Sequence, residues 1–366
     1  MKFSDLLKSI RTIKSQAYSS GLSRGVCLIL IFTSLLSFSS CKEISKAPQK
    51  KTYYDFFDTV CVISYYGNEG EEYFEETVSF IEGELEKYHR LFDAYHAYAG
   101  MSNLYTVNSA AGVSPVTVDP MLIRLIEYGK QVYELTDGEV NICFGAVTFL
   151  WKTAKEQADT YPSGASLPTK EELEEAERHT SPNLIVIDES ASSVYLSDPL
   201  ASLDVGSIGK GFAAERIAEA LKERGDTSFV LDLGGNIRAV GSKPDGSGWI
   251  TGIEDPHENE KDPFAARIEL KDRSCVTSGD YRRYFTVNGK NYHHIIDRDT
   301  LFPAEYFSSV TVTAADSALC DALSTALFCM PLEDGRRLIE SIDGAEALWI
   351  ATNGEVFFSS GFTPLE

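Results

Sequence analysis

Apolar residues recur every three or four positions in several stretches of the chain, which is the spacing of one face of an α-helix. The pattern is clearest at residues 73–88 and 120–135, and the second stretch ends at Thr136-Asp137-Gly138, a typical stop signal. In the first stretch, the residues that share a face are Phe74, Val78, Ile81 and Leu85. Further helices are predicted at residues 149–156, 210–224, 314–330 and 333–342.

In other stretches of three to ten positions, apolar residues either alternate with polar residues or follow one another without a break. Both patterns are typical of strands. Strands are predicted at residues 56–65, 184–188, 194–196, 229–233, 237–241, 249–253, 266–270, 283–287, 310–313, 348–351 and 356–359. Asn353-Gly354 favours a hairpin between the last two. Strands and helices do not alternate regularly, so the chain is predicted to be α+β, with mixed, largely antiparallel sheets packed with helices. Residues 159–182, rich in Pro, Gly, Ser and charge, are predicted to be a surface excursion.

The N-terminus has the pattern of a processed segment. Residues 1–25 are basic and polar, residues 26–36 are apolar, and small residues precede Cys41. This predicts a signal peptide over residues 1–40, too short in its apolar part for an ordinary membrane span. Ser39-Ser40-Cys41 resembles a bacterial lipoprotein box, with Phe38 where Leu is commoner; the alternative is ordinary cleavage without a lipid. We therefore expect a lipid on Cys41 and a charged tether over 41–52.

These features predict an extracytoplasmic, membrane-anchored bacterial lipoprotein on the periplasmic side, whose folded part is residues 53–366. The 366 residues include 33 Lys and Arg against 55 Asp and Glu. Five bases and one acid lie in the first 40 residues, so the remainder has 28 bases, 54 acids and a net charge of −26. Nucleic acid is excluded as a partner by this charge, and a polyanionic ligand needs local help from a metal, a helix N-terminus or a single Lys. Five scattered cysteines after Cys41 give no zinc or redox spacing and are predicted to be buried free thiols.

A glycine-rich segment, residues 204–211, precedes the predicted helix 210–224. Glycines let a backbone approach a ligand closely, and a helix N-terminus offers free N–H groups to a phosphate. Lys210 adds a positive charge. The spacing is neither that of a Walker loop nor that of a dinucleotide fingerprint. The alternative is a tight turn in which Asp204 caps backbone N–H groups.

Two further segments contain polar residues that could face a ligand. Residues 232–236, Asp-Leu-Gly-Gly-Asn, follow a predicted strand and favour a sharp turn. Residues 277–282 are followed by His293 and His294, which point to opposite faces if they lie on a strand, so that one of them can face a site. A zinc site is not indicated, because no spaced Cys or His partners follow.

The predicted helix 314–330 contains Asp321 and Thr325, which are four residues apart and share one face. Because the helix is mostly small and apolar, a carboxylate there needs a partner. Carboxylate, hydroxyl and backbone carbonyl oxygens suit Mg²⁺. The alternatives are a salt bridge for Asp321 and a hydrogen bond from Thr325 to the carbonyl of Asp321.

Taken in order, these segments resemble the FAD:protein FMN transferases, the ApbE family. The resemblance runs from about residue 57 to residue 328. The segments are residues 57–59, 103–108, 137–141 with 150–151, 204–211, 232–236, 277–279, 294–297 and 321–325. Residues 53–366 would then form a single catalytic unit.

The resemblance implies metal-dependent transfer of FMN from FAD to a Thr or Ser hydroxyl of an extracytoplasmic target flavoprotein, with release of AMP. The metal would be Mg²⁺, or Mn²⁺, bound by Asp321, Thr325 and the backbone carbonyl of Ser207. Asp321 would also be a catalytic residue, and His294 is a candidate base, with an Asp as the alternative. The residues implied to contact FAD are Phe57, where Met is common in the family, Tyr95, Glu139, Val140, Asn141, Asp204, Lys210 and Ile296.

One segment departs from the family pattern. The usual Asp-Pro-x-Thr-Gly-x-Pro run is Asp-Arg-Asp-Thr-Leu-Phe-Pro at residues 297–303, with Arg298 for Pro and Leu301 for Gly. A changed loop conformation is therefore expected there. Two rival functions remain open: hydrolysis of FAD to FMN and AMP, and FAD binding without catalysis. The second predicts a broken metal site, whereas Asp321 and Thr325 are both present. The sequence does not name the target protein.

Overall fold

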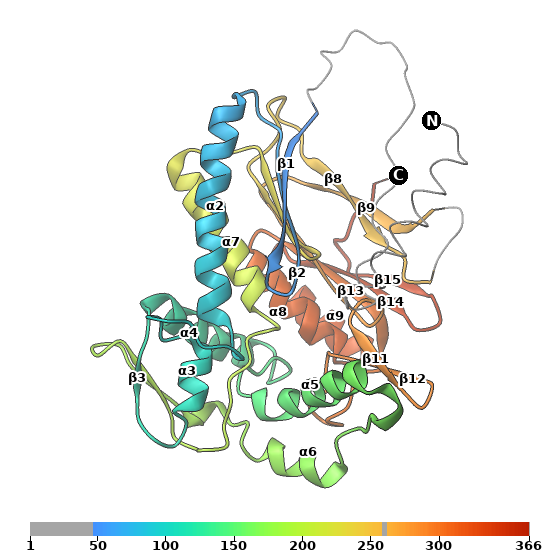
Figure 1. Ribbon diagram of the computed structural model, residues 1–366. Helices are drawn as coiled ribbons and strands as arrows, with labels where there is room; N and C mark the ends of the chain where they lie inside the picture. Colours follow the sequence, from blue (N-terminus) through green and yellow to red (C-terminus); the bar gives the residue numbers. More distant parts are fainter. Residues whose placement is uncertain (1–46, 258–261, 366) are drawn as a thin grey trace, which may run out of the picture. The chain divides into compact units, whose positions relative to one another are not determined.

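A computed structural model describes residues 47–257 and 262–365 (Figure 1). The predicted signal peptide and residues 41–46 of the predicted tether segment, Cys41 included, lie outside these residues. The helices are α2 (Glu71–Phe92), α3 (Leu104–Ser109), α4 (Pro120–Leu135), α5 (Gly145–Thr160), α6 (Lys170–Glu177), α7 (Gly209–Arg224), α8 (Ser317–Phe328) and α9 (Leu332–Glu340). No helix among the described residues is long and apolar enough to cross a membrane.

The main sheet has eight strands in the order β1-β2-β6-β7-β10-β13-β14-β15, and every neighbouring pair is antiparallel. Its strands are β1 (Gln49–Phe56), β2 (Thr59–Tyr65), β6 (Phe229–Leu233), β7 (Asn236–Val240), β10 (Ser274–Gly279), β13 (Phe307–Ala314), β14 (Glu346–Ala351) and β15 (Val356–Phe358). The smaller sheets contain β3 (Val116–Thr117), β4 (Ile185–Asp188) and β5 (Ser193–Leu196), β8 (Trp249–Glu254) with β9 (Phe264–Leu270), and β11 (Tyr284–Val287) with β12 (Lys290–His293). The predicted α+β class with largely antiparallel sheets is confirmed.

Each face of the main sheet has its own apolar core, because successive strand residues point to opposite sides. Val276 and Trp349 pack in the core shared with α2, α7 and α8, whereas their neighbours Cys275 and Leu348 pack on the other side. That second core is closed by the β8–β9 hairpin, which contributes Trp249 among others. Helices α7 and α8 therefore lie together on one face of the sheet, with α8 against β10 and β13 (Figure 1).

The first hairpin differs from the prediction of one strand over residues 56–65. Two strands, β1 and β2, meet at a two-residue turn in which Phe57 and Asp58 have φ angles of 53° and 50°. Asn and Gly are usual in such a turn, because positive φ is unfavourable for bulky side chains. No pattern of apolar residues marks this turn. Strand β1 begins at Gln49, so residues 49–52 of the predicted tether are paired in the sheet.

Short elements stabilised by local capping were not predicted. Helix α6 lies inside the predicted surface excursion, starts at a capping box of Thr169 with Glu172, and has a single buried residue, Leu173. Helix α3 begins at a similar box formed by Asn103 and Thr106. By contrast α4 has the predicted bounds, and α7 stops at Gly225, whose φ of 83° is the left-handed conformation of a helix end. The five cysteines after Cys41 are free and buried, as predicted.

The loop at residues 297–303 has a tight turn even though Gly is replaced by Leu301. The carboxylate of Asp297 accepts hydrogen bonds from the N–H groups of Asp299 and Thr300, both at 2.8 Å. Leu301 has a φ of 62°, its carbonyl accepts from Trp151 Nε1 at 2.9 Å, and its side chain is buried among aromatic residues. Burial of the Leu side chain therefore offsets the strain of a left-handed backbone, which costs about 1–2 kcal/mol.

Leu301→Gly is expected to destabilise the protein less than Leu301→Ala, by about 1 kcal/mol. Both variants lose the buried side chain, at a typical cost of about 2–5 kcal/mol, but only Gly removes the steric penalty of positive φ. Urea denaturation of the two variants beside the unmodified protein measures the difference. A smaller loss for Ala than for Gly would contradict the presence of strain at Leu301.

Candidate functional site

The side chain of Asp321 caps a helix other than its own. Its Oδ2 accepts a 2.7 Å hydrogen bond from the N–H of Gly211, in the first turn of α7, and its Oδ1 lies 3.5 Å from Lys210 Nζ. Ile208, at the N-cap position of α7, supplies no capping side chain, so the carboxylate from α8 takes that place. Asp321 is only 3% exposed. Burial raises the pKa of Asp321, and the Lys210 ammonium opposes that rise.

The close approach of α7 and α8 requires a glycine at position 211. A Cβ built on Gly211 would lie 2.4 Å from the carbonyl oxygen of Ser317 and 2.5 Å from Asp321 Cβ. The glycine-rich segment was expected to bring its backbone near a ligand. Gly211 also brings α8 against α7, which places Asp321 at the start of α7.

Gly211→Ala is expected to lower the free energy of unfolding by about 1–3 kcal/mol, the usual cost of overpacking. The matched control is Gly209→Ala on the same helix, where the new Cβ would meet Val205 Cγ2 at an ordinary 3.5 Å. We expect the control to change stability little, because Ala is the better helix former. Thermal unfolding of both variants checks the pair, and equal losses would show that helix packing does not select Gly211.

Hydroxyl groups from α8 and β10 gather one helical turn beyond Asp321. Thr325 Oγ1 donates to the carbonyl of Asp321 at 3.3 Å, as the alternative interpretation of this residue required. Ser278 Oγ lies 2.9 Å from Ser324 Oγ and 3.5 Å from Thr325 Oγ1. The hydroxyl of Thr325 is half-buried, and because its proton is donated to Asp321, its oxygen can accept from or bind a further ligand.

The carbonyl of Ser207 lies just before α7 and lacks its helical donor. In a continuous helix, the N–H of Gly211 would bond to the carbonyl four residues back, but here it donates to Asp321. At the same turn, the Gly206 carbonyl accepts a hydrogen bond from Lys210 Nζ at 3.3 Å. The Ser207 oxygen is therefore available to a ligand that lies between α7 and α8.

The oxygen atoms at this junction fit a hard divalent cation. One carboxylate, one hydroxyl and one backbone carbonyl are the donor types that Mg²⁺ prefers, usually with waters or substrate phosphates completing its shell. The unfavourable burial of the Asp321 charge also favours a bound cation there. Within residues 47–257 and 262–365, no group of three or more His, Cys, Asp and Glu side chains could hold a metal. Metal binding here would therefore depend on hydroxyl and carbonyl oxygens beside a single carboxylate.

A second cluster surrounds Asp204, on the loop before α7. Its Oδ1 accepts from the N–H of Gly206 at 2.8 Å, the predicted turn cap. Its Oδ2 accepts from Thr148 Oγ1 at 2.8 Å and from the Tyr95 hydroxyl at 3.4 Å. Lys152, one turn from Thr148 on α5, lies over the Tyr95 ring. Thr148 and Lys152 were not predicted, because α5 was expected to begin only at residue 149 and no motif marks them.

The loop that carries Tyr95 is held by two polar residues. The Asp93 carboxylate accepts from the Tyr95 N–H at 2.7 Å and the Tyr98 hydroxyl at 2.8 Å. Burial raises the pKa of Asp93, but these donors outweigh it and lower the pKa overall. The side-chain amide of Asn103 donates to the carbonyls of Arg90, in the last turn of α2, and of Asp93 and His96, the last at 2.8 Å. Tyr95 is therefore presented by a rigid segment, and burial raises its own pKa.

Phe57, at the strained β1–β2 turn, lies against the end of α2. Its N–H donates to His89 Nδ1 at 3.1 Å, and the two rings meet edge to face at 5.8 Å. Non-glycine residues with positive φ are concentrated at functional sites, where the surroundings hold the strain. Burial raises the pKa of Tyr95 and lowers that of Lys152, and the negative charge of Asp58 raises both pKa values, so this turn lies near the Asp204 cluster.

The 297–303 loop contacts the 137–141 segment, which carries three of the residues predicted to contact FAD. Arg298 Nε lies 3.3 Å from Glu139 Oε1, and Arg298 also donates to the carbonyl of Asp137. Burial raises the pKa of Glu139 to about 7, and Arg298 opposes the rise. The residue that departs from the family pattern thus ties its loop to the 137–141 segment. Val140 and Ile296 are buried in apolar clusters.

The side chain of Asn141 is already engaged on both sides: it donates to the Thr180 carbonyl, in the segment after α6, at 2.8 Å and accepts from the Cys143 N–H at 2.9 Å. A ligand would meet its backbone rather than its amide.

The two adjacent histidines have different environments, as predicted. His293, the last residue of β12, is half-buried and holds the Ala304 carbonyl through Nε2 at 2.8 Å. His294 is exposed, and its Nδ1 lies 3.3 Å from the Arg283 carbonyl. Surrounding protein atoms and then the Arg283 charge lower the pKa of His294. A neutral ring must donate from Nδ1 to that carbonyl, so Nε2 is left as an acceptor.

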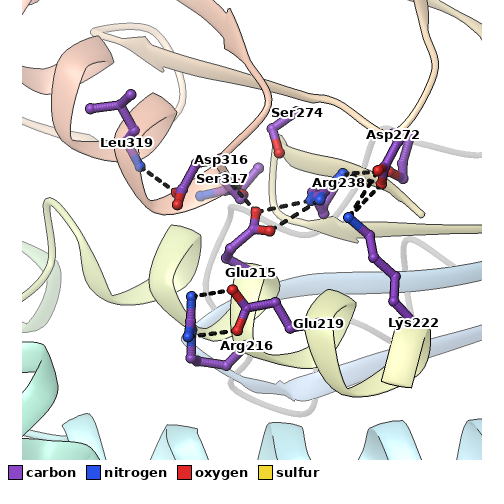
Figure 2. A network of polar contacts seen from close by, with 12 residues as sticks. Glu215, Arg216, Glu219, Lys222, Arg238, Asp272, Ser274, Asp316, Ser317 and Leu319 are labelled. Carbon is purple, nitrogen blue, oxygen red and sulfur yellow. Dashed lines mark hydrogen bonds and ion pairs between the residues drawn. The ribbon is translucent and has the colours of Figure 1, made fainter. Parts of the chain in front are cut away.

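A buried ion pair fixes the start of α8 against α7 (Figure 2). Arg238, 1% exposed, donates to both oxygens of Glu215 at 2.9 and 3.0 Å. Glu215 also accepts from the Ser317 N–H at 2.7 Å, and Arg238 reaches Asp272 at 3.2 Å. Since Asp321 lies one turn along α8 from Ser317, this network sets its position. No sequence motif marked Glu215 or Arg238, because their partners are distant in the chain.

The chain resembles known proteins over most of its length. A family profile described as the ApbE family matches residues 57–349. A protein of Treponema pallidum named FAD:protein FMN transferase is 34% identical over 274 residues, covering 71% of this chain and 74% of that protein. One of the same name from Klebsiella pneumoniae is 30% identical over 270 residues, covering 72% and 81%. The crystal structure of the ApbE protein of Thermotoga maritima matches with a TM-score of 0.74 at 28% identity, over 86% of this chain and 97% of that one.

Proposed function

The chain belongs to the ApbE family, and we propose that it transfers FMN from FAD to a Thr or Ser hydroxyl of a target protein, with Mg²⁺ or Mn²⁺, releasing AMP. The observation that carries this proposal is the buried Asp321 carboxylate at the N-terminus of α7, beside Lys210 and the Thr325 hydroxyl. The Asp321 carboxylate can bind a metal cation, and Lys210 is itself a cation. Both lie at the N-terminus of α7, and a helix N-terminus can accept a phosphate.

In this reaction, the hydroxyl oxygen of the acceptor forms a bond to the FMN phosphorus of FAD. The bond from that phosphorus to the oxygen bridging the two phosphates breaks, AMP leaves with the bridging oxygen, and the hydroxyl proton is given up. Transfer at phosphorus depends on charge neutralisation and in-line positioning more than on covalent help from the protein. The chain therefore needs positive charge at the pyrophosphate and a proton acceptor near the attacking oxygen.

Asp321, Thr325 and the Ser207 carbonyl would hold the metal, which when bound would neutralise pyrophosphate charge. Lys210 adds a positive charge from α7, and its 3.5 Å contact with Asp321 keeps it at the same place. The Asp204 cluster with Tyr95 and the Phe57 turn would hold the flavin end, and the rigid loop around Asp93 orients the Tyr95 ring. Glu139, Val140, Asn141 and Ile296 would contact FAD from the other loop.

His294 is proposed as the base that takes the acceptor proton. An imidazole is mostly neutral at physiological pH, and the Nδ1 of His294 is held by the Arg283 carbonyl at 3.3 Å. Nε2 is then free to accept a proton, and the exposed position of the ring lets a protein substrate approach it.

The place of this reaction is also a proposal. A signal peptide over residues 1–40 and a lipid on Cys41 would put residues 53–366 on the periplasmic side of a bacterial membrane. The target would then be an extracytoplasmic flavoprotein subunit, and the acidic surface, with 54 acids against 28 bases after residue 40, makes nucleic acid an unsuitable partner.

The test incubates the purified protein with FAD, Mg²⁺ and an acceptor protein carrying an accessible Thr, with and without EDTA. AMP is quantified and the acceptor is examined by mass spectrometry. We expect AMP and an acceptor carrying FMN in equal amounts, both abolished by EDTA. AMP with free FMN and an unmodified acceptor would mean hydrolysis instead, and bound FAD without AMP would mean a flavin-binding protein without this activity.

A further inference from the structure

Arg283 lies between the β1–β2 turn that carries Phe57 and the proposed base His294. It directly precedes β11, and its Nη2 donates to the carbonyl of Asp58 at 3.0 Å. Its own carbonyl lies 3.3 Å from His294 Nδ1. One residue therefore joins the strained Phe57 turn to the proposed base.

The guanidinium of Arg283 has no carboxylate within 4.0 Å among the residues that the structure describes. Its neighbour Arg282 is paired with Glu254 at 2.5 Å. In a chain with a large excess of acids, an exposed arginine without an acidic partner is a prominent positive charge. It uses one of its five N–H donors on Asp58, which leaves the others for a ligand.

The charge of Arg283 reaches a functional group already described. Desolvation by the surrounding protein atoms lowers the pKa of His294, the proposed base, and the Arg283 charge lowers it further, in keeping with the 3.3 Å between His294 Nδ1 and the Arg283 carbonyl. Lys210, the other cation at this place, is already 3.5 Å from Asp321 and 3.3 Å from the Gly206 carbonyl. A pyrophosphate has several oxygens to satisfy, and a guanidinium can bind those that the metal and the partly engaged lysine would leave free.

We propose that Arg283 is a substrate-binding and catalytic residue that contacts the FMN-side phosphate of FAD. This rests on the proposed function. The Asp58 carbonyl holds the guanidinium at the Phe57 turn, and the Arg283 carbonyl lies beside His294 Nδ1, so a phosphate bound between this turn and His294 would meet the guanidinium. Arginine suits this role because its planar fork binds two phosphate oxygens together, which lysine cannot do.

The test compares Arg283→Gln, Arg283→Lys and Arg283→Ala with the matched control Arg282→Gln. FAD affinity is measured by flavin fluorescence, and AMP release by kcat and KM in Mg²⁺. We expect Arg283→Gln to weaken FAD binding about tenfold and to lower kcat about 10²-fold, with Arg283→Lys between it and the unmodified protein. Arg282→Gln should keep both values within about twofold. Guanidinium chloride should restore activity to Arg283→Ala more than NaCl at the same concentration does.

The inference is overturned if Arg283→Gln binds FAD and releases AMP as Arg282→Gln does, or if guanidinium gives no more recovery than NaCl. If the unmodified protein releases no AMP, the proposed function fails and the binding comparison alone decides on Arg283. In that case equal FAD affinity of Arg283→Gln and Arg282→Gln would overturn the inference as well.

Discussion

Replacing Asp321 with Asn is expected to reduce AMP release from FAD by about 10²–10³-fold, with little loss of stability. The amide keeps an oxygen that can accept from the Gly211 N–H, so the cap on α7 survives. The negative charge that would hold a divalent cation is lost, and removal of one electrostatic group at a reacting centre typically costs this much. Initial rates in saturating FAD and Mg²⁺ measure the effect, with thermal unfolding run in parallel.

The matched control is Asp316→Asn, five residues earlier at the N-cap of α8. Asp316 accepts from the Leu319 N–H at 2.9 Å, and Asn serves equally well at an N-cap. This variant should keep its activity within about twofold. Asp321→Ala, which removes the cap as well as the charge, should be inactive and also less stable, by about 1–2 kcal/mol. If Asp321→Asn kept more than half of the activity, metal binding at Asp321 would be contradicted.

Glu215→Gln is expected to lower the free energy of unfolding by about 3–5 kcal/mol. The substitution removes the buried carboxylate partner of Arg238 and leaves only the half-exposed Asp272 at 3.2 Å, and breaking a buried ion pair from one side typically costs this much. The amide oxygen of Gln can still accept from the Ser317 N–H, so the expected loss comes from the ion pair and not from this hydrogen bond. Urea denaturation, read by circular dichroism, gives the value.

An exposed ion pair on the same helix provides the comparison. Arg216 and Glu219 lie 2.6 Å apart with side chains 26% and 45% exposed (Figure 2). Glu219→Gln should change the free energy of unfolding by less than about 1 kcal/mol, because solvent-exposed pairs contribute little. Similar losses for Glu215→Gln and Glu219→Gln would mean that the buried pair does not hold α8 in place.

The main elements of the fold could be predicted wherever apolar periodicity is long and ended by a clear signal. Helix α4 is bounded by Pro120 and by Thr136-Asp137-Gly138, and α7 by Gly225, and each signal acts through local backbone geometry. The β1–β2 turn could not be predicted, because Phe57 and Asp58 take positive φ under tertiary constraint. Helix α6 could not be predicted, because a single buried residue does not produce the apolar periodicity of a helix.

The candidate site could also be predicted only in part. The pairing of Asp321 with Thr325 on one helix face follows from their four-residue spacing, and their proximity in the structure agrees with it. The capping of α7 by Asp321, the steric role of Gly211 and the Glu215–Arg238 pair depend on contacts between residues far apart in the chain. Local pattern cannot reveal such contacts. At residues 297–303, where the sequence departs from the family pattern, the tight turn formed by Asp297 and the buried Leu301 again depends on contacts that the motif does not specify.

The most direct test of the account is the location of the metal. Crystals grown with FAD and Mn²⁺ would be measured near the manganese absorption edge, and the anomalous signal would locate the ion. We expect a peak bonded to the Asp321 carboxylate and the Thr325 hydroxyl, and no peak there in crystals of Asp321→Asn. An ion bound elsewhere, with FAD in place and neither side chain coordinating it, would contradict the account.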